Sequence, residues 1–281
     1  MIRTSLPDLA EHLRSYKVPK YSTVIVHSSL FHFGQFEGGV RNFFRTIEEV
    51  FDDTYTLVMP AFNWGFPKTK VWNYHTTKSQ CGILTEHMRA LPGTLRTIHP
   101  FHSLVARGPN ADALASDICT SSFGPRSAFE KLIEAGAYNL SLGSEFIGGA
   151  TFCHYAEEAL KVPYRFYMDF PGEVTDAANE KVNVNFNMYA RIIEQTHQFV
   201  NTWEIFWEDA LRHNLARYDR FNGHTPVFLM NVRDAHEFLY DRIKRDPYYV
   251  AKRIETAVAR GMSGSNSHSG GSIDMTLEFP L

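Results

Sequence analysis

The stretches AYNLSLG at residues 137–143 and GGATFCHYAEE at residues 148–158 decide the fold and locate its site. The first is apolar and strand-like and the second begins a helix, so together they indicate a β–loop–α unit of an α/β protein. We expect the Thr151 hydroxyl to cap this helix by accepting from the amide of His154. His154 then lies in the first helical turn, where the helix dipole disfavours a charged imidazolium.

Two carboxylates follow His154 along the same predicted helix. Glu157 and Glu158 come three and four residues later, so they share a helical face with His154. A neutral imidazole beside a carboxylate is a good general base, because the carboxylate orients the ring and stabilises the cation formed on proton uptake. From these residues alone a second interpretation stays open, namely a capped helix with a solvated Glu pair and a half-buried histidine.

The composition is that of a globular chain with a substantial core. Its 281 residues are 44% hydrophobic and carry a formal net charge of −3, which predicts no nucleic-acid partner because phosphate binding needs concentrated positive charge. Three widely separated cysteines form neither a disulfide framework nor a CxxC metal pair. The first residues lack the apolar core of a signal peptide, and no run of about 18 apolar residues occurs. We therefore expect a cytoplasmic protein without a membrane span.

The periodicity along the chain predicts one α/β domain over residues 1–260 and a low-complexity tail over residues 261–281. Further expected elements are helices at 7–15, 40–51, 82–91, 203–217 and 232–245, strands at 23–27, 55–60 and 103–106, and an antiparallel pair at 165–170 and 180–186 joined through Pro171-Gly172. The β–α–β order near the N-terminus favours parallel pairing. We expect a mixed, largely parallel central sheet flanked by helices, with antiparallel strands in the C-terminal half.

Other polar and aromatic segments carry weaker signals. His27-Ser28-Ser29 ends the first expected strand, where free amides and hydroxyls can cradle a phosphate or simply form a turn. The long irregular segment 61–80 contains aromatic side chains that can line a sugar pocket or pack on the core: Phe62, Trp64, Phe66, Trp72 and Tyr74. His99 and His102 suggest a metal pair, but no HExxH motif accompanies them, and we predict no metal.

Taken in order, these segments resemble the aminoglycoside 3-N-acetyltransferase family over roughly residues 20–255. The motifs that carry the resemblance are HSSL at 27–30, GG at 38–39, TLVMP at 56–60, GILTE at 82–86, PGTLRTIHP at 92–100 with Ser103 and Ala106, Phe123-Gly124 with Ser127, and TxxHxxE at 151–157. Each motif is weak by itself, and their order makes the series specific.

The resemblance implies transfer of an acyl group from a coenzyme A thioester (acetyl-CoA or 3-hydroxybutanoyl-CoA) to a sugar amine, by direct attack and without a metal. It implies that His154 is the base and Glu157 its orienting carboxylate. It also implies that the coenzyme lies beside His27, Ser28, Ser29, Ser103 and Val105. As substrate-binding candidates we take Asn63, Trp64, Arg96 and His99. A homodimer is the expected assembly.

The charge of the presumed site wall suggests a particular acceptor. Segment 61–80 carries three lysines and no Asp or Glu, and two arginines follow it: Lys68, Lys70, Lys78, Arg89 and Arg96. Such a wall would repel a polycationic aminoglycoside and attract an anionic sugar. We therefore expect a dTDP- or UDP-linked deoxyamino sugar of polysaccharide biosynthesis as the acceptor.

Three other functions stay open at this level. The first is an aminoglycoside 3-N-acetyltransferase that confers antibiotic resistance. The second is a metal-dependent amidohydrolase that uses His99, His102 and His154. The third is a non-catalytic binding protein that has kept the fold.

Overall fold

The computed structural model describes residues 2–144, 149–194 and 197–255. The tail predicted over residues 261–281 lies outside these ranges, so the predicted division of the chain at residue 260 stays a prediction. Within the described ranges, the structure contains no helix with the length and apolar character needed to cross a membrane.

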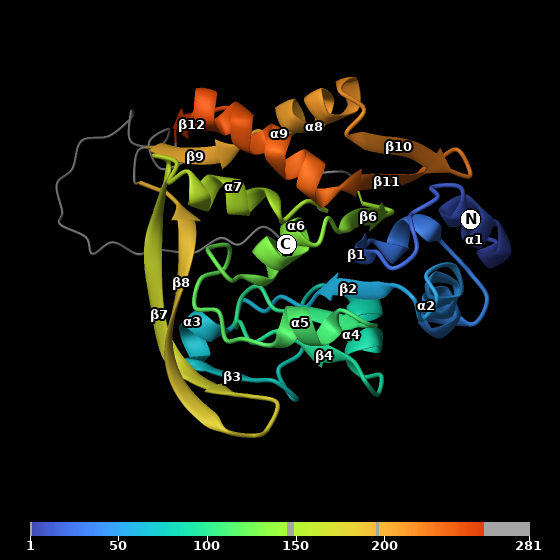
Figure 1. The fold of residues 1–281 in the computed structure, drawn as a ribbon, viewed down its shortest axis with the longest axis horizontal. Helices are drawn as coiled ribbons and strands as arrows, with labels where there is room; N and C mark the ends of the chain where they lie inside the picture. Colours follow the sequence, from blue (N-terminus) through green and yellow to red (C-terminus); the bar gives the residue numbers. More distant parts are fainter. Residues whose placement is uncertain (1, 145–148, 195–196, 256–281) are drawn as a thin grey trace, which may run out of the picture.

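A seven-stranded mixed sheet forms the centre of the molecule, in the order β10-β11-β6-β1-β2-β5-β4 (Figure 1). Its three middle strands are parallel: β6 (Tyr138–Leu142), β1 (Thr23–Ser28) and β2 (Thr56–Pro60). The outer strands pair antiparallel, namely β5 (Leu104–Arg107), β4 (Leu95–Arg96), β11 (Thr225–Asn231) and β10 (Ala216–Phe221). The predicted α/β class with a mixed central sheet is confirmed, and the parallel part is confined to the middle.

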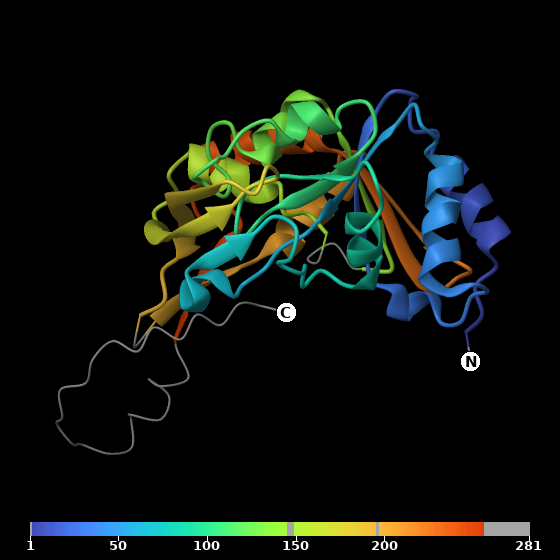
Figure 2. The same cartoon turned by 90° about the horizontal axis from the view of Figure 1, so that it is seen from below.

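Alternating side chains of the middle strands fill two cores, because successive strand residues point to opposite faces. Val24 and Val26 face one core, which is covered by α1 (Leu6–Arg14), α2 (Gly39–Val50) and α4 (Ile83–Arg89). Ile25 faces the other core, which is covered by α5 (Ala111–Ala115), α6 (Ala128–Glu134), α7 (Cys153–Ala159), α8 (Trp203–Arg212) and α9 (Val232–Arg245). Figure 2 shows α1 and α2 side by side on one flank of the sheet.

A long hairpin makes a second sheet beside the first (Figure 1). Its strands β7 (Arg165–Thr175) and β8 (Lys181–Arg191) pair antiparallel, and β3 (Val71–Asn73) joins β7 in parallel. The predicted junction at Pro171-Gly172 is wrong, because both residues lie inside β7 and the turn occupies residues 176–180. The glycine permits a close approach instead, since a Cβ on Gly172 would lie 2.5 Å from the Lys70 carbonyl oxygen.

Shorter elements complete the described chain. The segment predicted to be irregular, 61–80, contains α3 (Phe66–Thr69) as well as β3. A 3-10 turn, η1 (Leu30–Phe33), follows β1, and β9 (His197–Asn201) pairs with β12 (Ala251–Glu255). Helix α8 ends before the predicted residue 217, because Asn214 adopts a left-handed conformation and the chain continues into β10.

Candidate active site

His154 lies on α7, which follows the carboxyl end of the parallel strand β6. The predicted cap is wrong: α7 begins at Cys153 without a side-chain cap, and the His154 amide donates to the main-chain carbonyl of Thr151 at 3.2 Å. His154 still occupies the first turn of the helix. The carboxyl edge of parallel strands is where α/β proteins place their ligands, so the location suits a catalytic side chain.

Glu157 is completely buried one turn further along α7 and holds three partners. Its Oε2 lies 2.5 Å from Nδ1 of His154 and 2.9 Å from Nη2 of Arg165, and its Oε1 accepts from the Tyr164 hydroxyl at 2.7 Å. Burial alone would raise the pKa of Glu157, but the Arg165 guanidinium and His154 outweigh it and lower this pKa to about 2. The carboxylate is therefore ionised and can only accept hydrogen bonds.

An ionised Glu157 determines the tautomer of His154. Its short contact requires a proton on Nδ1 of His154, so Nε2 of the neutral ring is left with its lone pair. Nη2 of Arg165 also lies 3.2 Å from Nδ1, but two donors cannot bond, and Arg165 therefore bonds the carboxylate. Burial and then Arg165 lower the pKa of His154, while Glu157 acts in the opposite direction. The His154 side chain remains 23% exposed, so a substrate can reach it.

Two further histidines are buried nearby and meet at Ser122. Nδ1 of His102 lies 2.9 Å from the Ser122 hydroxyl, and Nε2 of His99 lies 3.4 Å from it. Burial lowers the pKa of His99 to about 3 and that of His102 well below its usual value. Over residues 2–144, 149–194 and 197–255, His, Cys, Asp and Glu form no group of three suited to a metal. The hydrolase alternative therefore gains no support from the geometry.

The side chains predicted to border the coenzyme occupy different environments. Ser28 and Ser29 are partly exposed at the carboxyl end of β1. His27 is buried in β1, Ser103 is buried with its hydroxyl donating to the Ala61 carbonyl at 2.7 Å, and Val105 packs in the core. Contact with a coenzyme stays a prediction for all five residues, and the geometry favours the two partly exposed serines.

The predicted substrate-binding residues separate into two pairs. Trp64 and His99 lie by His102, with ring centroids at 5.0 Å and 6.0 Å from its ring. Asn63 instead holds a turn, where its side chain accepts from the Gly65 amide and donates to a main-chain carbonyl. Arg96 is only 2% exposed. Its guanidinium donates to the Ser103 hydroxyl and to main-chain carbonyls, including that of Ala61 at 3.0 Å, so it supports the fold.

Comparison with known protein families identifies the family of this chain. The model of the family described as aminoglycoside 3-N-acetyltransferase matches residues 25–244. The chain belongs to this family. A curated relative, the SPbeta prophage-derived aminoglycoside N(3')-acetyltransferase-like protein YokD of Bacillus subtilis (strain 168), is 28% identical over 180 residues, which cover 56% of this chain and 65% of that protein. The match thus spans just under two thirds of the relative.

Solved structures show the same fold. The crystal structure of aminoglycoside acetyltransferase AAC(3)-Xa superimposes with a TM-score of 0.74 at 21% identity and covers 86% of this chain and 93% of that one. The binary structure of AAC-IIIb with CoASH superimposes with a TM-score of 0.73 at 18% identity and covers 86% and 97% of the two chains. The architecture of this 3-N-acetyltransferase family member is therefore shared over most of its length.

The expectation of a nucleotide-linked sugar as acceptor is wrong. The matching family and these relatives carry the names of aminoglycoside acetyltransferases. The basic wall that suggested an anionic acceptor is also weaker than predicted: Lys68, Lys70 and Lys78 are exposed, but its two arginines are not free surface charges. Arg96 is enclosed by carbonyl oxygens, and Arg89 pairs with both carboxylate oxygens of Glu86 at 2.8 Å and 2.9 Å. The predicted role in polysaccharide biosynthesis, which depended on that acceptor, is therefore not supported.

Sequence reasoning missed the residues that complete the site of this family member. Tyr164 and Arg165 bind Glu157, and the rings of Phe123 and Trp203 lie 4.9 Å and 5.4 Å from the His154 ring. The sequence signals were the position of the Tyr-Arg pair shortly after the acidic helix and the Phe123-Gly124 motif of the family resemblance. Phe123 and Trp203 come from distant segments, so only the fold brings them to His154.

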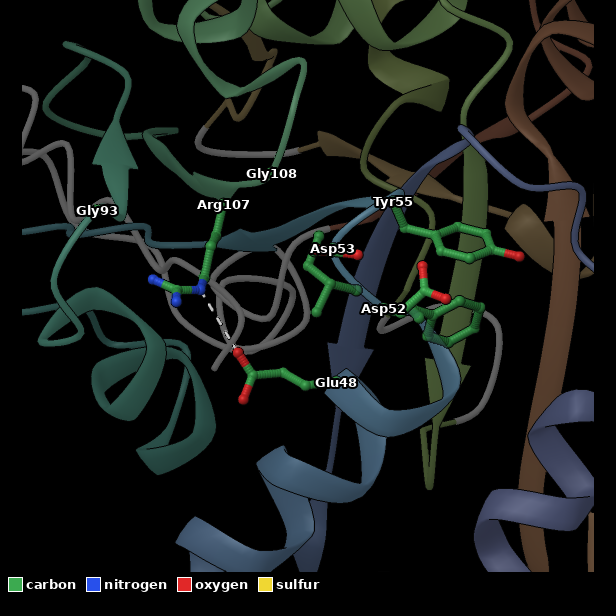
Figure 3. Close-up of a pocket in the computed structure, with 9 residues that line it drawn as sticks. Glu48, Asp52, Asp53, Tyr55, Gly93, Arg107 and Gly108 are labelled. Carbon is green, nitrogen blue, oxygen red and sulfur yellow. Dashed lines mark ion pairs between the residues drawn. The ribbon is translucent and has the colours of Figure 1, made fainter.

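A separate cavity of about 330 Å³ lies by the amino end of β2, opposite the end where the candidate active site lies (Figure 3). Acidic side chains line it together with Arg107, whose Nε lies 3.5 Å from Oε1 of Glu48. Tyr55 of this cavity precedes β2, whereas Ser103 adjoins the end of β2 through a hydrogen bond between its carbonyl and the Ala61 amide. The length of β2 therefore separates this cavity from the histidines of the candidate active site.

Proposed function

We propose that this chain is a coenzyme A-dependent N-acetyltransferase that acetylates an amine of an aminoglycoside. The observation that carries the proposal is the contact between Nδ1 of His154 and the buried, ionised Glu157, which leaves Nε2 of an accessible ring as a base. Membership of the family supports the acceptor class, and the relative bound to CoASH supports the donor. The acyl group is accordingly proposed to be acetyl.

The residues of the site fit a direct transfer. A sugar ammonium group must lose a proton before its nitrogen attacks the thioester carbonyl, and Nε2 of His154 accepts that proton. The imidazolium that forms is stabilised by Glu157 at 2.5 Å. The neighbouring thiol of Cys153 is buried, and burial followed by Glu157 raises its pKa well above the usual value, so an acyl-cysteine intermediate is disfavoured. The coenzyme is proposed to lie along the carboxyl end of β1, by Ser28 and Ser29.

The test is release of free coenzyme A from acetyl-CoA in the presence of a panel of aminoglycosides, with mass spectrometry of the product. We expect turnover of at least one aminoglycoside and a loss of roughly 10²- to 10⁴-fold in His154→Ala. 3-Hydroxybutanoyl-CoA serves as the competing donor. Absence of transfer to every aminoglycoside, or full activity of His154→Ala, would overturn the proposal. The homodimer stays a prediction, which sedimentation of the purified chain tests.

A further inference from the structure

We propose that His102 is a second catalytic histidine of this site, whose Nε2–H donates a hydrogen bond to the thioester carbonyl oxygen while His154 removes the proton from the amine. This inference rests on the proposed acetyl transfer. Two observations carry it: the hydrogen bonds around Ser122, from which we assign the proton of each ring, and the Phe123 ring, which lies against both His102 and His154.

The first step is the tautomer of His99. Its Nδ1 accepts from the main-chain amides of Phe101 at 3.2 Å and His102 at 3.1 Å. A nitrogen that accepts carries no proton, so the ring proton of His99 is on Nε2. That proton is directed to the side of the ring where the Ser122 hydroxyl lies, 3.4 Å from Nε2.

The second step is the hydroxyl of Ser122, which has one hydrogen to donate. Nδ1 of His102 lies 2.9 Å from this oxygen, and the carbonyl oxygen of Asn187 lies 3.5 Å from it. The contact with His102 is a normal hydrogen bond, whereas that with Asn187 is at the distance limit, so we assign the hydroxyl hydrogen to Nδ1 of His102 as part of this proposal. Because Nδ1 of His102 accepts, the proton of its neutral ring is on Nε2.

The third step is the charge state of His102. Burial lowers its pKa most, and His99, His154 and Arg165 lower it further because each is cationic or becomes so on protonation. His102 therefore stays neutral at working pH and keeps Nε2–H as a donor. A neutral imidazole of this kind can act as an electrophile toward a carbonyl oxygen.

The surroundings of His102 suit a donor to substrate. The Phe123 ring lies 4.6 Å from the His102 ring and 4.9 Å from the His154 ring, so it contacts both histidines. The rings of Phe62 and Trp64 lie 5.0 Å from His102 on edge-to-face contacts. Side chains in the described part of the chain give Nε2 of His102 no hydrogen-bond partner, and the residue keeps 7% of its surface accessible. Aromatic walls exclude water and strengthen such a hydrogen bond.

The two histidines then divide the reaction between them. The proton that Nε2 of His154 takes from the ammonium group first passes to solvent, which leaves a neutral amine and a neutral ring. The amine nitrogen then forms a bond to the carbonyl carbon, the π electron pair moves to oxygen beside Nε2–H of His102, and one N–H proton of the attacking nitrogen passes to Nε2 of His154. When the tetrahedral intermediate collapses, the carbon–sulfur bond breaks and its electron pair leaves with sulfur. The thiolate takes the proton from the His154 imidazolium, which restores the starting ring.

The kinetic test compares two amide replacements. His102→Gln places an amide NH₂ where Nε2 stood, whereas His102→Asn places one where Nδ1 stood and leaves the substrate side without a donor. We expect His102→Asn to lower kcat by about 10²- to 10³-fold with little change in the KM for acetyl-CoA, and His102→Gln to recover most of that loss. Equal activity of both variants and wild type would refute the inference.

A spectroscopic test does not depend on turnover. Wild-type protein with ¹⁵N-labelled histidine, in which His102→Gln identifies the signal of His102, should show a neutral ring protonated on Nε2 between about pH 6 and 8. A proton on Nδ1, or an imidazolium in this range, would overturn the inference even if His102→Asn does not fold. Wild-type turnover that is lost in His154→Ala but unaffected in a folded His102→Asn would refute this inference alone. Failure of the wild type to acetylate any aminoglycoside would refute the proposed function and the role of His102 with it.

Discussion

Replacing Glu157 with Gln is the sharpest perturbation of the catalytic base, because it removes a charge and keeps the shape. Glu157 is enclosed by His154, Tyr164 and Arg165 at 2.5–2.9 Å. Without the carboxylate, the imidazolium that forms on proton uptake faces Arg165 with no compensating charge. The loss is therefore expected in the transition state more than in substrate binding, so kcat falls and KM changes little.

The size of the effect follows from the burial of the pair. Breaking a fully buried ion pair costs about 3–5 kcal/mol, and about 1.4 kcal/mol corresponds to a tenfold change in rate. If most of this cost falls on the transition state, kcat decreases by about 10²- to 10⁴-fold. The range agrees with the contribution of a general base and its orienting carboxylate.

The pH dependence gives a second readout with a defined sign. The reaction needs neutral His154, so the rate falls as the pH drops through the pKa of His154, which burial and Arg165 already hold below 6.5. Glu157 raises this pKa, and its loss therefore moves the acidic limb of the pH–rate profile to lower pH.

Glu158→Gln is the matched control, because it makes the same change on the same helix at a buried carboxylate that bonds Ser121. Its kcat and acidic limb are expected to stay close to those of the wild type. A Glu157→Gln enzyme with near wild-type kcat, or with an acidic limb that stays in place or moves to higher pH, would refute the role of Glu157.

Three further substitutions test other parts of the structure. Burial holds the pKa of His27 at about 4, so below pH 6.5 the unfolded chain binds a proton that the folded chain does not bind. The free energy of unfolding, measured with denaturant, should therefore decrease from pH 7 to pH 5 by roughly 2 kcal/mol less in His27→Gln than in the wild type. In the exposed control His224→Gln, this decrease should equal that of the wild type. Arg96→Lys should lower the free energy of unfolding by about 3 kcal/mol or more and leave the aminoglycoside KM of the folded enzyme unchanged. A raised KM with normal stability would indicate instead that Arg96 binds the substrate. Gly172→Ala should cost about 1–3 kcal/mol in thermal unfolding, because its Cβ would meet the Lys70 carbonyl and Phe66, and an unchanged melting temperature would contradict this packing.

The order of strands and helices was readable from the sequence where local pattern and tertiary role agree. Val24, Ile25 and Val26 alternate between two cores, which is what a buried parallel strand requires, and the helical spacing of His154 and Glu157 is local to α7. Pro171-Gly172 was misread because its role depends on the close crossing of a distant segment. Local spacing predicts contacts within one helix, and contacts between segments need the fold.

The same limit explains why charge was misread at the site wall. A sequence shows that Arg96 is cationic, but only the fold shows that carbonyl oxygens enclose it and remove it from the surface. Burial thus changes the meaning of a charge: an exposed arginine attracts anions, whereas a buried one ties loops together. Counting Arg96 with the exposed Lys68, Lys70 and Lys78 therefore overstated the positive surface, and the family match overturned the acceptor predicted from it.

The two histidines of the site show how one residue type acquires opposite roles. In His154, Nδ1 donates to the carboxylate of Glu157, so Nε2 presents a lone pair and serves as a base. In the tautomer that we propose for His102, Nδ1 accepts from the Ser122 hydroxyl, so Nε2 presents a proton and serves as a donor. Both rings are neutral and both contact Phe123, and the difference lies only in the partner of Nδ1. In Ser122→Ala, the tautomer of His102 should no longer be fixed by this hydrogen bond, whereas that of His154 should stay unchanged. The ¹⁵N chemical shifts of the two rings can test both expectations.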